Sequence, residues 1–237
     1  PLLFEKGINA LSDAKKGKAT GFAMSLDSTS SGLQCFAVLT GCTRTAENTN
    51  IINTGKREDV YAKIAKTMNA LPNVNVSRED TKKPVMTTLY GSKRQPERLF
   101  GKGTSDLQAF YQSLTTELPG AMEALEDLQS SWNPMASDYR WTLPDGFKVI
   151  ARVMAPVDKK IELQEYGKTT FTHRAIMNIP QNRGRSLAAN AIHSVDSYIC
   201  REMIRRCDFA LYTVHDAYFA SPNNMQVVRQ TRANSGL

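Results

Sequence analysis

The hydrophobic pattern of this chain changes period after Trp132, and this change limits the folds open to it. Before Trp132, apolar residues recur every three or four positions, which is typical of helices with one buried face. After it, residues 139–154 alternate around the turn Pro144-Asp145-Gly146, which predicts a β-hairpin. Residues 160–174 indicate further strands. Helices and antiparallel strands in separate stretches indicate the α+β class.

Several segments have the spacing and end signals of amphipathic helices. We expect one after the turn that begins at Asp27, one over residues 57–71, one capped by Thr104 or Ser105, one that begins at Pro119, and one over residues 184–206. In the last of these, the predicted buried face consists of Ile192, Val195, Ile199 and Met203.

Two apolar strands are predicted to end in carboxylates. Residues 21–27 alternate and place Asp27 at the C-terminal end of a half-buried strand. Residues 208–214 form a second strand that ends at His215-Asp216, and residues 217–221 form the returning strand. Turn aspartates are common, so these residues alone leave a structural and a functional interpretation open.

The stretch from Thr81 to Lys93 reads TKKPVMTTLYGSK. Proline fits best in the first turn of a helix, so Pro84 predicts a helix that begins at Asp80 or Thr81. That start would place Lys82 and Lys83 beside free backbone amides, where phosphate oxygens bind readily.

Lys82, Met86 and Tyr90 follow one another at intervals of four, so they share one side of the helix. Lys82 and Tyr90 would stand about 12 Å apart, which suits the phosphates and the base of one nucleotide. The alternative is an ordinary surface helix with a basic first turn. His193 lies beside the buried stripe of its own helix, where a histidine usually has a structural role.

The chain has 237 residues and a formal net charge of +7, with basic clusters at 78–102 and 183–206. A net positive charge with clustered basic residues fits a polyanionic partner. The four cysteines form two pairs spaced by seven, which predicts core thiols on one helix face rather than a zinc or redox motif. No apolar run is long enough for a membrane span and no signal peptide is present, so a soluble intracellular protein is expected.

Asp27, Asp216 and the helix that carries Lys82 together supply the charged groups that phosphoryl transfer with two metal ions requires. Two carboxylates on neighbouring strands can hold a pair of Mg²⁺ ions about 3.5 to 4 Å apart. Phosphoryl transfer depends mostly on positioning and charge stabilisation, so few other groups are needed.

Three ordered motifs resemble those of the bacteriophage-type single-subunit RNA polymerases. They are DSTSSGLQCF at 27–36, the pattern R-x3-K-x7-YG at 78–91, and HD at 215–216. Three further segments resemble the T-odd coliphage enzymes, namely 59–68, 142–149 and 190–197. The sequence of the segment TKKPVMT is more similar to that of the N-four-like phage branch.

This resemblance implies a right-hand polymerase whose palm is an antiparallel sheet and whose fingers are helical. Its palm would comprise 1–77 and 136–237, and its fingers 78–135. Two Mg²⁺ ions would be held by Asp27, Asp216 and the backbone carbonyl of Ser28.

The resemblance also implies the nucleotide contacts. Arg78 and Lys82 would bind the triphosphate, and Lys82 would protonate the departing pyrophosphate. Tyr90, followed by Gly91, would stack at the insertion site and, with His193, favour a ribose that bears its 2′-hydroxyl. The implied partners are a DNA template, the RNA product and ribonucleoside triphosphates, without a membrane, in the cytoplasm of an infected bacterium or in the virion before entry.

The family's N-terminal domain and thumb have no counterpart in this sequence, so we expect a second subunit, or the remainder of a longer polypeptide, to supply them. The alternatives are an A-family-like DNA polymerase, an inactive nucleic-acid-binding remnant and a small-molecule nucleotidase. Met86 stands where A-family enzymes usually carry an aromatic residue, and they lack an equivalent of residues 190–194, which favours RNA synthesis. A remnant would need basic residues but not paired acids.

Overall fold

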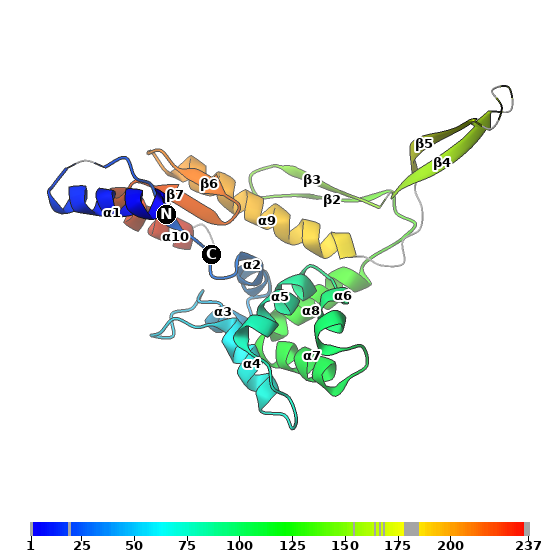
Figure 1. Ribbon diagram of the computed structural model, residues 1–237, viewed down its shortest axis with the longest axis horizontal. Helices are drawn as coiled ribbons and strands as arrows, with labels where there is room; N and C mark the ends of the chain where they lie inside the picture. Colours follow the sequence, from blue (N-terminus) through cyan, green and yellow to red (C-terminus); the bar gives the residue numbers. More distant parts are fainter. Residues whose placement is uncertain are drawn as a thin grey trace.

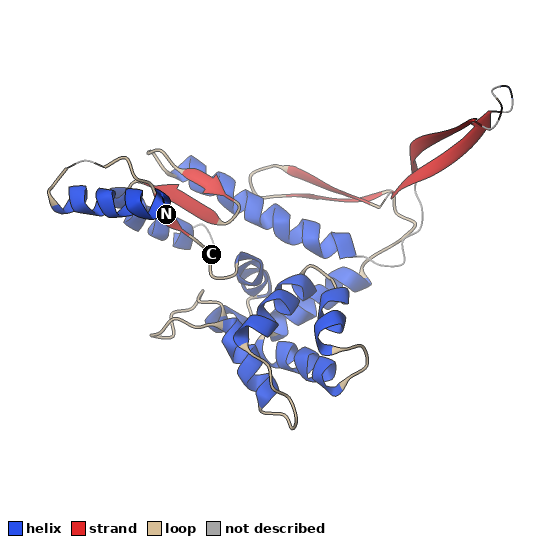
Figure 2. Ribbon diagram, in the orientation of Figure 1, coloured by secondary structure: helices blue, strands red, loops and turns tan. Residues whose placement is uncertain are grey.

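The computed structural model describes residues 2–18, 20–153, 155–163, 165, 167, 169–177 and 185–234. Its helices gather mainly in the lower body of Figure 1, and its strands lie along the upper edge (Figure 2). The sheets are small and antiparallel. This mixture agrees with the predicted α+β class.

A cluster of helices forms the body of the molecule. Its members are α2 (Ser31–Thr40), α3 (Thr43–Asn48), α4 (Val60–Asn69), α5 (Arg78–Leu89), α6 (Arg94–Phe100), α7 (Ser105–Glu117) and α8 (Pro119–Ser130). Helix α4 packs against α5 and α7, and α2 packs against α8. Phe36, Ile64, Val85 and Phe110 are fully buried between them. The predicted cap at Thr104 and the predicted helix start at Pro119 are confirmed.

The long helix α9 (Arg185–Arg206) connects this body to the strands (Figure 1). It contacts α2 and α8 on one side and β3 on another. Ile192, Ile199 and Met203 are buried as predicted, and Val195 packs against them. The first residue of the predicted helix, Gly184, lies outside the described residues.

A three-stranded antiparallel sheet places both predicted aspartates. Its order is β1 (Met24–Leu26), β7 (Ala217–Ala220), β6 (Tyr212–Val214). The predicted strands over 21–27 and 208–214 are both too long. Met24 is exposed, and Phe209 and Leu211 pack against the core without joining the ladder, so apolar character here reflects packing rather than pairing.

Two separate ribbons follow the helical body. They are the hairpin of β2 (Asp138–Thr142) with β3 (Lys148–Arg152), and the hairpin of β4 (Ala155–Leu163) with β5 (Thr169–Met177). The first was predicted as a hairpin, although its pairing ends at Arg152 and Met154 lies outside the described residues. For the second, the sequence predicted only strands within 160–174, and the observed strands extend beyond both ends of that range. The second projects away from the rest of the molecule in Figure 1, and its Ile161 and Phe171 are exposed.

Two terminal helices have no counterpart in the sequence prediction. Helix α1 (Leu2–Lys15) buries no residue, whereas α10 (Met225–Asn234) buries Val228 fully and contacts α9, β1 and β7. Within the described part of the chain, no helix combines the length and the hydrophobicity that crossing a bilayer requires.

The prediction of core thiols is confirmed for Cys35 and for Cys200, which packs against the core, and is wrong for Cys42 and Cys207. Only Cys35 is buried, while Cys42, Cys200 and Cys207 are half-buried, and all four are free thiols. Helix α2 ends before Cys42 because Gly41 adopts a left-handed conformation, so Cys35 and Cys42 lie on different elements.

Candidate active site

Helix α5 begins at Arg78, which corrects the predicted start at Asp80 or Thr81. Ser77 caps the helix: its hydroxyl accepts from the Asp80 amide, and the Asp80 carboxylate accepts from the Ser77 amide at 2.9 Å. This capping box satisfies two otherwise free donors and fixes the helix start. Pro84 therefore lies in the helix interior rather than in its first turn.

The earlier start removes one predicted feature of the site. The first turn carries the acidic residues Glu79 and Asp80, which suit the positive end of the helix dipole. Lys82 and Lys83 lie beyond this turn, so free amides do not surround them. A phosphate near Lys82 would depend on the lysine charge rather than on the helix N-terminus.

A pocket of about 730 Å³, here called the central pocket, brings most of the predicted site residues together. Its walls come from the turn between β1 and α2, from α5, from α9 and from the turn between β6 and β7. The predicted site residues among them are Asp27, Ser28, Lys82, Tyr90, His193 and Asp216. Met86 also lines this pocket, so the predicted Lys82, Met86 and Tyr90 side of the helix is confirmed as one face.

Asp27 and Asp216 lie at the same end of the three-stranded sheet. Strands β1 and β7 are antiparallel with Leu26 opposite Tyr218; Asp27 directly follows β1 and Asp216 directly precedes β7. His215, the first turn residue, has φ of 54°, a conformation that glycine usually takes in such turns. The backbone of this turn therefore places Asp216 in the wall of the central pocket.

The chemistry of these two residues suits Mg²⁺, which prefers oxygen ligands and keeps waters or phosphate oxygens in its remaining positions. Among the described residues, no group of three or more His, Cys, Asp or Glu side chains is gathered to hold a metal ion. Asp27 and Asp216 both line the central pocket, whose volume leaves room for substrate oxygens.

The rings of Tyr90 and His193 contact each other in the wall of the central pocket. Their ring centroids are 5.0 Å apart at an interplanar angle of 42°. The Tyr90 hydroxyl lies so close to Gly32 that a Cβ atom there would come within 3.3 Å of it. Burial, and then the Asp196 carboxylate, raise the pKa of Tyr90, so the phenol stays protonated at neutral pH and can donate a hydrogen bond.

Gly91 does not line the central pocket. It has φ of 79°, and its amide donates to the Thr88 carbonyl while the Ser92 amide donates to the Thr87 carbonyl. These bonds terminate α5 as a left-handed glycine does in many helices. Gly91 therefore fixes the end of the helix that carries Tyr90.

Arg78 also lies outside the central pocket, one turn before Lys82. Its Nε donates to Asp59 at 2.6 Å and its Nη1 to Glu79 at 2.6 Å, and its guanidinium lies 5.6 Å from the ring of Tyr61. Burial alone would raise the pKa of Asp59, but the bond from Arg78 and the amides of α4 hold it below its usual value. Arg78 borders a second pocket instead.

Asp196 is a pocket residue that the sequence analysis missed. It lies one turn after His193 on α9, and its two oxygens accept from Ser31 Oγ at 3.3 Å and Cys35 Sγ at 3.4 Å. Burial, and then the neighbouring Asp216, raise its pKa. The only signal available in the sequence was its spacing of three from His193 within residues 190–197.

Ser28 is held by a helix that the sequence analysis did not predict. Arg232 of α10 donates to the Ser28 hydroxyl and, at 3.0 Å, to Gln34 Oε1. The Ser28 hydroxyl also contacts Gln34 Oε1 at 3.3 Å. Helix α10 thus supports the turn that follows Asp27.

Comparison with known proteins finds one family model that is similar to part of the chain. The model of the family described as DNA-dependent RNA polymerase matches residues 8–99. This segment contains Asp27, Lys82 and Tyr90 but not Asp216, and the match supports the phage-type resemblance there. No curated protein matches the chain significantly.

Proposed function

We propose that this chain carries the catalytic centre of a DNA-directed RNA polymerase, which adds ribonucleotides to RNA on a DNA template. One observation carries this proposal: Asp27, Lys82, Tyr90, His193 and Asp216 come from separate elements and line one pocket. The family match covers the first three and supports polymerase function in general terms.

Asp27 and Asp216, with the backbone carbonyl of Ser28, are the residues that would hold two Mg²⁺ ions. Bound Mg²⁺ would neutralise phosphate charge and make the attacking hydroxyl more acidic. The residues fit this task because both carboxylates lie at one end of the sheet and face a pocket with room for substrate.

In the proposed reaction the 3′-oxygen of the RNA attacks the α-phosphorus of the nucleotide and forms a new phosphorus–oxygen bond. The bond from that phosphorus to the bridging oxygen breaks, and pyrophosphate leaves with the electron pair. The 3′-hydroxyl proton passes to water, and Lys82 donates a proton to the pyrophosphate. Positioning and charge account for most of the catalysis in such transfers.

Tyr90 and His193 would form the nucleoside end of the site. Their rings contact each other in the wall of the pocket, and Lys82 lies two turns before Tyr90 on the same face of α5. A nucleotide placed with its sugar at Tyr90 would therefore have its phosphates near Lys82. His193 and the Tyr90 hydroxyl are the groups that would contact the ribose.

The wider architecture belongs to the same proposal. Residues 1–77 and 136–237 would form the palm and 78–135 the fingers, with a second subunit or further polypeptide acting as thumb. The formal charge of +7 would favour the DNA template and the RNA product.

An A-family-like DNA polymerase is the main alternative, since it would use the same paired carboxylates and lysine. Two side chains in the pocket favour RNA. Met86 lines the pocket where an aromatic residue would be expected in that family, and His193 is positioned opposite Tyr90.

Extension of an RNA primer annealed to a DNA template would test the proposal, with the chain purified together with its natural partners. Ribonucleoside and deoxyribonucleoside triphosphates compete in one reaction. We expect template-dependent addition of ribonucleotides. Preference for deoxyribonucleotides would indicate the DNA polymerase, binding without extension the inactive remnant, and triphosphate hydrolysis without nucleic acid the nucleotidase.

A further inference from the structure

Tyr218 lies in β7, the middle strand of the three-stranded sheet, and only 2% of its surface is exposed. It pairs with Leu26 of β1, the residue before Asp27. Its hydroxyl lies beside Cys200 of α9, and its ring lies beside Arg232 of α10. Each of these two residues also contacts one of the turns that carry the proposed metal ligands.

Cys200 connects α9 to the turn that carries Asp216. Its Sγ donates to the backbone carbonyl of His215 at 3.0 Å and lies 3.7 Å from the Tyr218 hydroxyl. A thiol has one proton, which the carbonyl receives, so the Tyr218 hydroxyl is the donor to the sulfur. Burial raises the pKa of Cys200, so the thiol keeps the proton that it donates. The left-handed residue His215 is therefore held through its carbonyl by α9.

Arg232 connects α10 to the turn that carries Ser28. Its Nη2 donates to the Ser28 hydroxyl and, at 3.0 Å, to Gln34 Oε1. Gln34 is fixed in its turn, because its amide group donates to the Thr49 carbonyl at 2.8 Å. The guanidinium carbon lies 5.7 Å from the centre of the Tyr218 ring, a distance at which cations are attracted to aromatic rings.

These contacts form one continuous path from the His215 carbonyl through Cys200, Tyr218 and Arg232 to Ser28. Helix α10 packs against α9, β1 and β7, so both ends of the path rest on packed elements. A thiol and a guanidinium are not the oxygen ligands that Mg²⁺ prefers. The two side chains can therefore act on a bound cation only by placing its ligands.

We propose that Cys200 and Arg232 are positioning residues of the divalent-cation site. Through Tyr218 they hold the two ligand-bearing turns at the spacing at which the cations are shared. The inference rests on the proposed function, which supplies the cations. Groups that orient metal ligands typically contribute tenfold to a hundredfold in metal affinity.

Arg232 gives the sharper test, because its charge and its position predict opposite effects. Removing a positive charge beside a cation site would by itself tighten cation binding. If Arg232 places the turn at Ser28, Arg232→Ala should instead weaken binding of Mn²⁺, which takes the same oxygen ligands as Mg²⁺, by about tenfold. Arg232→Lys keeps the charge but loses the paired donors, so it should also weaken binding.

Titration of the protein with Mn²⁺, after purification with its natural partners, measures this without nucleotide or turnover. The electron paramagnetic resonance signal of the free ion reports how much Mn²⁺ is bound. Circular dichroism of each variant confirms that it is folded.

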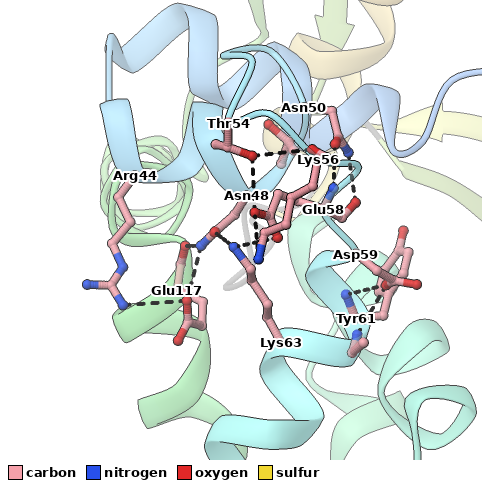
Figure 3. A network of polar contacts seen from close by, with 12 residues as sticks. Arg44, Asn48, Asn50, Thr54, Lys56, Glu58, Asp59, Tyr61, Lys63 and Glu117 are labelled. Atoms are coloured by element: carbon pink, nitrogen blue, oxygen red, sulfur yellow. Dashed lines mark hydrogen bonds and ion pairs between the residues drawn. The ribbon is translucent and has the colours of Figure 1, made fainter.

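Two control variants separate position from net charge and from packing. Arg44→Ala removes the same charge from a residue that bonds to Glu117 of α7 and does not line the central pocket (Figure 3). Val228→Ala removes buried methyl groups from α10 but leaves Arg232. Both should bind Mn²⁺ as the wild type does. Tighter or unchanged binding in Arg232→Ala, or equal weakening in Val228→Ala, would overturn the role of Arg232.

Cys200→Ala removes the bond to the His215 carbonyl and should weaken Mn²⁺ binding by about threefold to tenfold, the range of one hydrogen bond. Cys200→Ser keeps a donor and should restore most of the affinity. Cys207→Ala, at a half-buried thiol that does not line the central pocket, is the control. Unchanged binding in Cys200→Ala, or an equal loss in Cys200→Ser, would contradict the role of Cys200.

The two proposals fail separately. Primer extension by the wild type, with Mn²⁺ binding that neither Arg232→Ala nor Cys200→Ala changes, would retain the polymerase and contradict the positioning roles. Mn²⁺ binding that requires both Asp216 and Arg232, without primer extension, would retain the positioning roles and contradict the polymerase. Mn²⁺ binding that Asp216→Asn leaves unchanged would overturn the two-metal site together with its positioning residues.

Discussion

Asp59 joins the starts of two helices: its Oδ2 accepts a 2.6 Å hydrogen bond from Arg78 of α5, and its Oδ1 accepts the amides of Tyr61 and Ala62 in α4. One carboxylate therefore caps α4 and anchors the guanidinium of Arg78 at the start of α5. The two tasks can be separated by substitution, because asparagine caps helices as well as aspartate does.

Asp59→Ala should lower the free energy of unfolding by about 1 to 2 kcal/mol, mostly through loss of the cap. Asp59→Asn keeps the cap and loses only a partly exposed ion pair, so its cost should stay below about 1 kcal/mol. Urea denaturation of the three proteins measures both. Equal losses in the two variants would mean that the cap contributes nothing.

The ion pair should also show in the pH dependence. Since the pKa of Asp59 is lowered in the folded state, its contribution is present above the unfolded pKa of about 3.9 and is lost as pH falls through the folded value. The stability difference between wild type and Asp59→Asn should therefore shrink below about pH 4. A difference that is constant across this range would contradict the assignment.

Asp27→Asn and Asp216→Asn should each reduce nucleotide addition by at least about a thousandfold, since metal ions stabilise the transition state by several kcal/mol. Template binding should change little, because it depends on basic residues. Asp127→Asn, at an exposed position on α8, is the control. Normal turnover in either pocket variant would remove the two-metal proposal.

Asp196→Asn should change how stability depends on pH. The pKa of Asp196 is raised, so the folded state holds a proton that the unfolded state releases above about pH 3.9. Wild type should therefore lose stability relative to the variant as pH rises from about 4 through the folded pKa. Denaturation midpoints at a series of pH values measure this, and parallel curves would show that Asp196 is not desolvated.

The four thiols should react with iodoacetamide in a defined order. Burial opposes ionisation of Cys42, but hydrogen bonds led by the Thr45 hydroxyl outweigh it and lower its pKa. Burial, and then Asp196, raise the pKa of Cys35, which has no exposed surface. Mass spectrometry should show Cys42 modified first and Cys35 last, and the order should disappear in denaturant.

Local patterns predicted many elements of this fold. The turn Pro144-Asp145-Gly146 fixed its hairpin, and the cap signals at Thr104 and Pro119 marked true helix starts. Pro84 indicates a later start for α5, but Ser77 and Asp80 have the spacing of a capping box, and this cap sets the observed start.

The rest of the site depends on contacts between distant segments. Asp196 is held by Ser31 and Cys35, and Ser28 by Arg232, across separations that no local pattern encodes. The orientation of Arg78 is likewise set by a contact with a distant segment. Its spacing from Lys82 was visible in the sequence, but its direction is set by Asp59 of another helix.

The left-handed backbone of His215 has a consequence for how this protein can vary. Because a two-residue bend carries Asp216 from β6 into β7, the length of this bend fixes the backbone of Asp216 at one end of the sheet. An inserted residue would change the direction of the Asp216 side chain, whereas the distant β4–β5 ribbon could lengthen or shorten without moving Asp27 or Asp216. Natural relatives should therefore keep this bend at constant length even where they replace the histidine.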